Sequence, residues 1–209
     1  MRIRRCLGFG LLTLTALASA ASAQVKTGRT PEAWALVAGV DLYEEGSGIP
    51  NCPGALGDAR EVARWFQETA GWGNSHLIKL DRAGDTRPNG PFNGYVSLLP
   101  TLDNLEWAIS QIAARVQPGD FVLIYFAGQA GALPAEPGAD SAGEIPLLYA
   151  SDARANDPGG QVWHLERGID RIASKGSISV LCWLDTSLSG RGKTVPNVLA
   201  PPKFVPSGR

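Results

Sequence analysis

Two short segments of this chain contain the side chains best placed to do chemistry. Residues 125–131 (YFAGQAG) and 184–190 (LDTSLSG) each follow an apolar run and contain a glycine. Such segments are typical of turns at the carboxyl edge of a parallel sheet, where α/β proteins place their sites. The Ser187 hydroxyl is a candidate nucleophile, but a hydroxyl attacks at a useful rate only beside a base. The Gln129 amide exchanges hydrogen bonds but cannot take up a proton, so it cannot be that base.

A base for Ser187 would have to be one of two histidines, His76 and His164. His164 opens a predicted helix, and a right-handed strand–helix–strand crossover starts that helix at the same sheet edge as Ser187. His76 begins a predicted strand and therefore lies at the opposite edge. Most histidines at a helix start face solvent, so the sequence favours loss of catalysis and keeps a His164-dependent hydrolase as the alternative.

Strand and helix patterns alternate along the chain, as a parallel α/β sheet requires. Apolar runs predict strands over 34–40, 75–80, 121–126 and 177–184, with a short hairpin strand at 147–149. Apolar residues at helical spacing predict three helices, over 56–66, 101–116 with Thr101 as N-cap, and 162–172. Residues 82–100, rich in Gly, Pro and Asn, are expected to form a long loop.

The N-terminus has the pattern of a signal peptide over residues 1–23. Residues 1–5 are basic, residues 6–20 are almost wholly apolar, and residues 21–23 (ASA) form a small-x-small cleavage site. We expect a linker over 24–32, one domain over 33–192 and a proline-rich tail over 193–209. The apolar stretch is too short for a stable membrane span, although an uncleaved anchor is the alternative. The expected location is the periplasm or the extracellular space.

Charge and cysteine content exclude several classes of protein. Removing Arg2, Arg4 and Arg5 with the signal peptide changes the formal net charge from −1 to −4, because that segment contains no acidic residue. A chain of this charge does not indicate nucleic acid or an anionic membrane surface as partner. Cys182 lies in an apolar run, which is typical of an inert buried thiol, and Cys52 lies in a loop. Of the three cysteines, Cys6 is removed with the predicted signal peptide, and the remaining two do not make a disulfide framework.

Three further motifs, in chain order, accompany the first two segments. They are residues 39–43 (GVDLY), 54–59 (GALGDA) and 118–120 (PGD). With these motifs, residues 33–192 resemble the caspase-like peptidase family of metacaspase and orthocaspase type. In that family the first segment reads Ser-Gly-His-Gly and supplies the general base, and the second reads Asp-Ala-Cys-His-Ser-Gly and supplies the nucleophile. The catalytic positions are here Gln129 and Ser187, and Ala130, Leu188 and Gly57 also depart from the pattern.

The resemblance also implies a substrate pocket. In metacaspase-like proteins one aspartate at the entry to the first helix and one at the start of the nucleophile segment receive an Arg or Lys side chain. The matching residues are Asp58 and Asp185. A carboxylate pair suits a guanidinium, because bidentate charge-assisted hydrogen bonds are strong. The alternatives are that Asp58 stabilises a helix N-terminus and that Asp185 bonds local amides.

The fold implied by the resemblance has three layers, with a mostly parallel sheet and helices on both faces. The function implied is that of an exported bacterial relative of cysteine-type endopeptidases that acts as a binding or regulatory module, with Arg/Lys-containing peptides or proteins as ligands. A weakly active endopeptidase cleaving after Arg or Lys is the alternative. A third possibility is an incomplete domain without the family's small-subunit part, whose open sheet edge would invite a protein partner.

The sequence predicts no cofactor, because it contains no metal-ligand constellation. Calcium is conceivable at the acidic loop residues Glu136, Asp140 and Glu144, since some caspase-like relatives bind it through acidic loops. Solvated loop acids are the commoner explanation.

Overall fold

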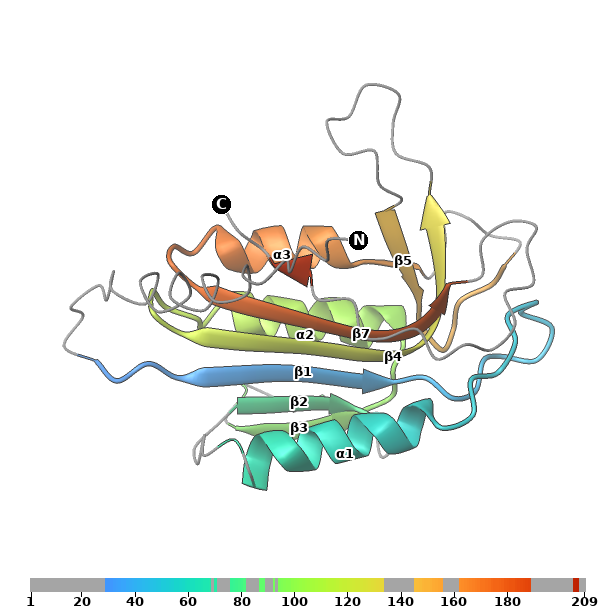
Figure 1. Ribbon diagram of the computed structural model, residues 1–209, viewed down its shortest axis with the longest axis horizontal. Coiled ribbons are helices and arrows are strands. Elements are labelled where there is room, and N and C mark those ends of the chain that lie inside the picture. The colour runs from blue at the N-terminus through green and yellow to red at the C-terminus, as the bar shows by residue number, and fades with distance from the viewer. Residues whose placement is uncertain are drawn as a thin grey trace, which may run out of the picture. The chain divides into compact units, whose positions relative to one another are not determined.

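The protein is an α/β fold built on one mixed sheet, seen in a computed structural model (Figure 1). The structure describes residues 29–68, 70, 76–81, 87–88, 92, 94–133, 145–155, 162–188 and 205–206, without the side chains of 132–133, 145–146, 187–188 and 205–206. In the described part the strand order is β3-β2-β1-β4-β5-β6, with β7 also paired to β4 and β8 to β7. The strands are β1 (Ala33–Gly39), β2 (His76–Leu80), β3 (Tyr95–Leu98), β4 (Phe121–Leu133), β5 (Ile145–Tyr149), β6 (Val162–His164), β7 (Ser179–Leu188) and β8 (Val205–Pro206).

The centre of the sheet is parallel and fully buried. Every residue of β1 is buried, and β1 pairs in parallel with β2 on one side and β4 on the other. β4 pairs in parallel with β7 over ten residue pairs, from Phe121↔Ser179 to Ala130↔Leu188. A strand covered on both faces has an apolar run rather than an alternating pattern, which is why residues 33–40 and 121–127 are so uniformly hydrophobic.

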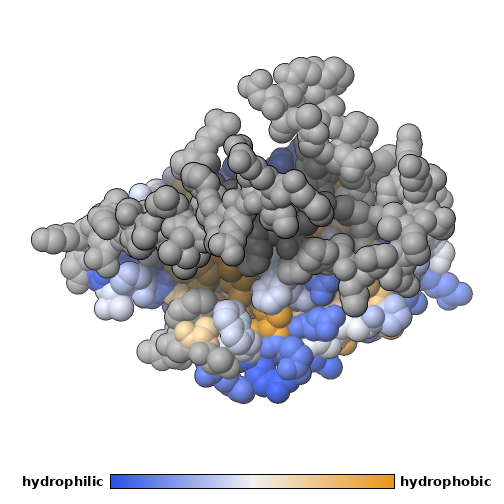
Figure 2. Space-filling view, viewed as in Figure 1, coloured by the Kyte–Doolittle hydropathy of each residue, from blue (hydrophilic) through white to orange (hydrophobic). Residues whose placement is uncertain are grey.

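Helices cover both faces of the sheet, as predicted. On one face, α1 (Ala55–Glu68) packs its buried Ala55, Ala59, Ala63 and Phe66 against alternate residues of β1 and β4. On the other face, α2 (Leu102–Ala113) and α3 (Leu165–Ala173) pack Leu105, Ile109 and Ile172 against the remaining residues of the same strands. The outer side of α1, at the bottom of the view, is mostly hydrophilic (Figure 2).

Close contact between α1 and β1 depends on a glycine. A Cβ added at Gly39 would lie 2.6 Å from the carbonyl oxygen of Ala55 and 2.7 Å from the Cβ of Ala59. The absence of a side chain at Gly39 therefore lets the first turn of α1 rest directly on the end of β1. That turn carries Asp58, so this contact also fixes the height of the Asp58 backbone above the sheet.

The predicted N-cap of the second helix is confirmed. The hydroxyl oxygen of Thr101 accepts a hydrogen bond from the Asn104 backbone N–H, with 3.3 Å between oxygen and nitrogen. The Asp152 carboxylate accepts a second one from the Leu102 N–H at 3.0 Å. Two of the unpaired amides at the start of α2 are thereby satisfied.

Three local predictions were wrong. Residues 82–100 were expected to form a loop, but residues 95–98 form β3. This strand pairs with β2, and its Val96 and Leu98 side chains are buried in the core. The segments around Gln129 and Ser187 were expected to be turns, but β4 and β7 continue through both positions as one ladder. The third helix begins at Leu165 rather than Val162, because residues 162–164 pair with β5 as β6.

In the part of the chain that the structure describes, no helix combines the length and hydrophobicity needed to cross a membrane. The predicted signal peptide lies outside the described residues, as does most of the predicted proline-rich tail.

Candidate functional site

The two positions that the sequence resemblance singled out as a catalytic pair lie side by side. Gln129 on β4 and Ser187 on β7 are 58 positions apart in sequence, yet they are direct partners in the parallel ladder. β1 ends at Gly39, opposite Ala127, so both positions lie just past the carboxyl end of the central strand. The sheet topology thus places Gln129 and Ser187 where the sequence placed a site, although on strands instead of turns.

The Gln129 backbone is hydrogen-bonded to a buried tyrosine, Tyr43. The Tyr43 hydroxyl accepts a hydrogen bond from the Gln129 backbone N–H at 2.7 Å and lies 3.5 Å from the Tyr149 carbonyl oxygen, to which it donates. Burial raises the pKa of Tyr43 above its ordinary value, so the phenol stays protonated. A Cβ at Gly128 would lie 3.0 Å from the Tyr43 hydroxyl, so the glycine leaves room for this contact. Sequence reasoning missed this role of Tyr43.

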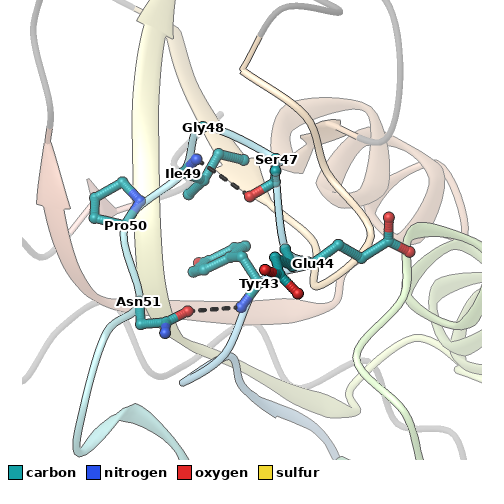
Figure 3. A pocket seen from close by; sticks show the side chains of 9 residues that line it. Tyr43, Glu44, Ser47, Gly48, Ile49, Pro50 and Asn51 are labelled. Atoms are coloured by element: carbon teal, nitrogen blue, oxygen red, sulfur yellow. Dashed lines mark hydrogen bonds between the residues drawn. The ribbon is translucent and has the colours of Figure 1, made fainter.

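The loop that carries Tyr43 is hollowed. Residues 43–51 line a hollow of about 380 Å³, which is shown in Figure 3. The loop is braced internally, because Asn51 Oδ1 accepts from the Tyr43 N–H at 3.1 Å and Ser47 Oγ accepts from the Ile49 N–H at 3.2 Å. It is also tied to residues 151–155 by two backbone hydrogen bonds. These hydrogen bonds fix the loop, and so they hold the Tyr43 hydroxyl in place for its hydrogen bond with the Gln129 N–H.

The charges of the two aspartates expected in the pocket act on the same buried tyrosine, Tyr125. The Tyr125 hydroxyl donates to Asp185 Oδ2 at 3.4 Å, and the Tyr125 ring contacts Trp183 edge-on, with 5.5 Å between ring centroids. Burial raises the pKa of Tyr125, and the charges of Asp185 and Asp58 raise it further. Asp58 and Asp185 thus act on one hydroxyl, although they come from α1 and β7. The hydrogen bond from Tyr125 was not foreseen.

The charges of Asp58 and Asp185 also affect the pKa of the Cys52 thiol. The thiol is half-buried, and burial raises its pKa, followed by the charges of Asp185, Asp58 and Asp41. The charges of three carboxylates therefore act on Cys52. Within the described residues, neither Asp58 nor Asp185 forms an ion pair with a Lys or Arg side chain. We call Asp41, Asp58 and Asp185 the acidic cluster.

Cys52 offers a direct check of this arrangement. Asp185→Asn removes one of the charges that raise the thiol pKa, so alkylation of Cys52 by iodoacetamide near neutral pH should accelerate about two- to fourfold. Mass spectrometry of timed samples gives the rate for each cysteine. Cys182 is the internal control, because it is 2% exposed and burial raises its pKa to about 11. An unchanged Cys52 rate would show that Asp185 does not act on the thiol.

The histidines lie away from the acidic cluster and from Ser187. His164 pairs with Leu147 on β5, so β5 and β4 separate it from β7. Three strand spacings correspond to roughly 14 Å between backbones, beyond the combined reach of a histidine and a serine. His76 begins β2 at the amino end of the sheet, where it stacks on Trp34 at 3.9 Å and lies 3.2 Å from a Glu32 carboxylate oxygen. The structure therefore brings neither histidine to Ser187.

Comparisons with known proteins find similarity to solved structures. No protein-family model and no curated protein matches this sequence. The chain is similar to the crystal structure of protein GSU0716 from Geobacter sulfurreducens, with 16% sequence identity and a TM-score of 0.49. The match covers 77% of this chain and 52% of that one, so this chain spans about half the length of that structure.

No metal site is found among the described residues, where no three His, Cys, Asp or Glu side chains are arranged to hold an ion. The acidic loop residues named for calcium, Glu136, Asp140 and Glu144, lie outside the described residues. The two described cysteines, Cys52 and Cys182, are free thiols.

Proposed function

We propose that this protein is an exported, caspase-like domain that binds Arg- or Lys-containing segments of other proteins without cleaving them. The observation that carries the proposal is the pairing of Gln129 with Ser187 on adjacent strands, with Asp185 two residues before Ser187. Five short motifs scattered over the sequence resemble one family. Two of them, those of Gln129 and Ser187, lie next to each other in the fold, as a shared ancestral site requires.

The side chains at this site favour binding over catalysis. An amide at position 129 cannot accept the proton that a nucleophile must lose, and a serine hydroxyl is far less ionised near neutral pH than a thiol. Both histidines of the chain lie away from Ser187, as their strand positions require. Since both members of the pair are replaced, neither Gln129 nor either histidine can serve as the base that acyl transfer by Ser187 would need.

The acidic cluster favours a cationic ligand. Asp58 and Asp185 are exposed, and their charges act on the same Tyr125 hydroxyl and Cys52 thiol. A guanidinium bound between two carboxylates forms charge-assisted hydrogen bonds, which are stronger than those between neutral groups. Among the described residues, neither carboxylate is paired with a Lys or Arg side chain.

Hydrolysis of fluorogenic Arg and Lys peptides tests the loss of catalysis. We expect no turnover by the unmodified protein above the level of Ser187→Ala. The restored variant Gln129→His/Ser187→Cys is expected to cleave slowly, because its two side chains would occupy adjacent strand positions, and Gln129→His/Ser187→Ala is its control. Activity in the unmodified protein that Ser187→Ala abolishes would make it a serine hydrolase. Absence of hydrolysis by the restored variant would contradict the idea that the substrate-binding cleft is retained.

A further inference from the structure

A second group of charged side chains lies at the carboxyl ends of β2 and β3, on the face of the sheet that α1 covers. Asp81 comes directly after β2, and Ser97 on β3 is the ladder partner of Lys79. Leu77, two residues before Lys79, is buried in the core beneath α1, so the alternation of a strand points Lys79 to the same face. Arg60 reaches this group from α1. The carboxyl ends of parallel strands are where α/β proteins place their sites.

Asp81 is a buried carboxylate that Lys79 and Ser97 hold closely. The Lys79 Nζ lies 3.0 Å from Asp81 Oδ2, and the Ser97 hydroxyl donates to Asp81 Oδ1. Although burial raises the pKa of Asp81, hydrogen bonds from Ser97 and Lys79 hold it below its ordinary value. Although burial lowers the pKa of Lys79, hydrogen bonds to Tyr95 and Asp81 raise it above its ordinary value. Both side chains are therefore charged.

The Arg60 guanidinium is a second cation on the same carboxylate, and it is held less closely. Its Nε lies 3.4 Å from Asp81 Oδ2, whereas charge-assisted N–H···O bonds are usually about 2.7–2.9 Å long. The Arg60 side chain is 55% exposed, against 19% for Lys79. Within the described part of the chain, the two Nη groups of Arg60 form no hydrogen bond or ion pair. One carboxylate thus faces two cations, and one positive charge is left over.

We propose that Arg60 and Lys79 bind an oxyanion, a phosphate or a carboxylate group, at the carboxyl ends of β2 and β3. The Arg60 Nε and the Lys79 Nζ both lie within 3.4 Å of the same Asp81 oxygen, so one oxyanion can reach both cations. The guanidinium fork matches two oxygens of one group and pairs with them bidentately. The hydroxyl of the exposed Tyr95 accepts from Lys79, which leaves its own proton to donate to the anion.

This oxyanion site is separate from the acidic cluster. Successive residues of a helix are turned by about 100°, so Asp58 and Arg60, two positions apart, leave α1 on opposite sides. The charge of Asp58 acts on Tyr125 in β4, whereas Arg60 contacts Asp81 after β2. The oxyanion site therefore goes beyond the proposed function and does not depend on it.

Titration of inorganic phosphate into the purified full chain, followed by two-dimensional 1H–15N NMR, tests this site. Sodium chloride keeps the ionic strength constant, so that screening does not change during the titration. We expect the amide signals of residues 60, 79 and 95–97 to shift together and to saturate at phosphate concentrations on the order of millimolar. Arg60→Gln should weaken binding about tenfold, because it removes a charged hydrogen-bonding partner.

Arg64→Gln is the matched control. Arg64 lies one turn further along α1 and is 54% exposed, but its guanidinium pairs with Glu61. This variant should bind phosphate as tightly as the unmodified protein. Arg60→Lys keeps the charge and loses the planar fork, so its affinity should lie between those of the unmodified protein and Arg60→Gln.

Sodium acetate in place of phosphate distinguishes two sources of the anion. Saturable binding of acetate as well would indicate a carboxylate of a protein or metabolite, and binding of phosphate alone would indicate a phosphate group. Shifts that rise linearly without saturating would overturn the oxyanion site. Saturable binding that Arg60→Gln leaves unchanged would overturn it too, and Arg60 would then be only a structural partner of Asp81. Both results would leave the proposed function untouched, because Asp58 and Asp185 take no part in this titration.

Discussion

The Asp185→Asn protein should bind an Arg-containing peptide at least tenfold more weakly than the unmodified protein. A hydrogen bond between charged partners contributes about 1.5–3 kcal/mol, and a loss of 1.4 kcal/mol is tenfold in affinity. Asparagine has almost the same shape and can still accept from the Tyr125 hydroxyl that lies 3.4 Å from Asp185 Oδ2. The substitution therefore removes charge with little change in packing. Asp58→Asn should act in the same direction, and the double variant should lose most of the affinity.

Fluorescence anisotropy at two salt concentrations measures this effect, since exposed charge pairs weaken as salt screens them. A citrulline peptide, neutral but close to arginine in shape, is the ligand control and should bind the unmodified protein weakly. Glu166→Gln is the protein control. Glu166 is an exposed acidic residue in the first turn of α3, which covers the face of the sheet opposite to the one covered by α1 and its Asp58. Equal affinity of Asp185→Asn, Asp58→Asn and the unmodified protein would refute the role assigned to the acidic cluster.

Gly39→Ala should lower the free energy of unfolding by about 1–3 kcal/mol. The new methyl group would lie 2.6 Å from a backbone oxygen of α1, and backbone cannot rotate away as a side chain can. Either α1 moves outward or β1 bends, and both loosen the packing of Ala55 and Ala59. Because Asp58 lies in the same helical turn, peptide affinity should fall as well.

Gly57→Ala is the matched control for Gly39→Ala. Gly57 lies in α1, and a Cβ added there meets no atom within 4 Å. In a helix interior alanine is more favourable than glycine by about 1 kcal/mol, so this variant should be stabilised. Urea denaturation followed by tryptophan fluorescence compares the two variants. A Gly39→Ala protein as stable as the unmodified one would contradict the close packing of α1 on β1.

The elements with a strong internal pattern could be predicted from the sequence. β1 and the first half of β4 are long apolar runs, and α1 and α2 have apolar residues at helical spacing with recognisable ends. The α/β class and the helices on both faces follow from their alternation. The neighbouring positions of Gln129 and Ser187 could be anticipated only through the resemblance, because no local pattern encodes pairing across 58 residues.

The missed features depend on tertiary contacts. β3 has only four residues, and Tyr95 and Ser97 give it an ordinary loop composition, so only pairing with β2 reveals it. The second half of β4 contains Gly128 and Gly131, which suggest a turn, but β5 and β7 pair with this half and keep it extended. The hydrogen bond from Gln129 to Tyr43 joins residues 86 positions apart and leaves no trace in either local sequence.

The strand order also has a consequence for how the chain folds. β1 is among the first elements along the described chain, but its partner β4 begins at Phe121, and β4 in turn needs β7, which ends at Leu188. The central sheet therefore cannot be completed until most of the chain has been synthesised. Pairings so distant in sequence fold slowly, typically in milliseconds to seconds. Because its central sheet is completed late, such a polypeptide stays unfolded during most of its synthesis. Passage through a membrane translocation channel requires an unfolded polypeptide.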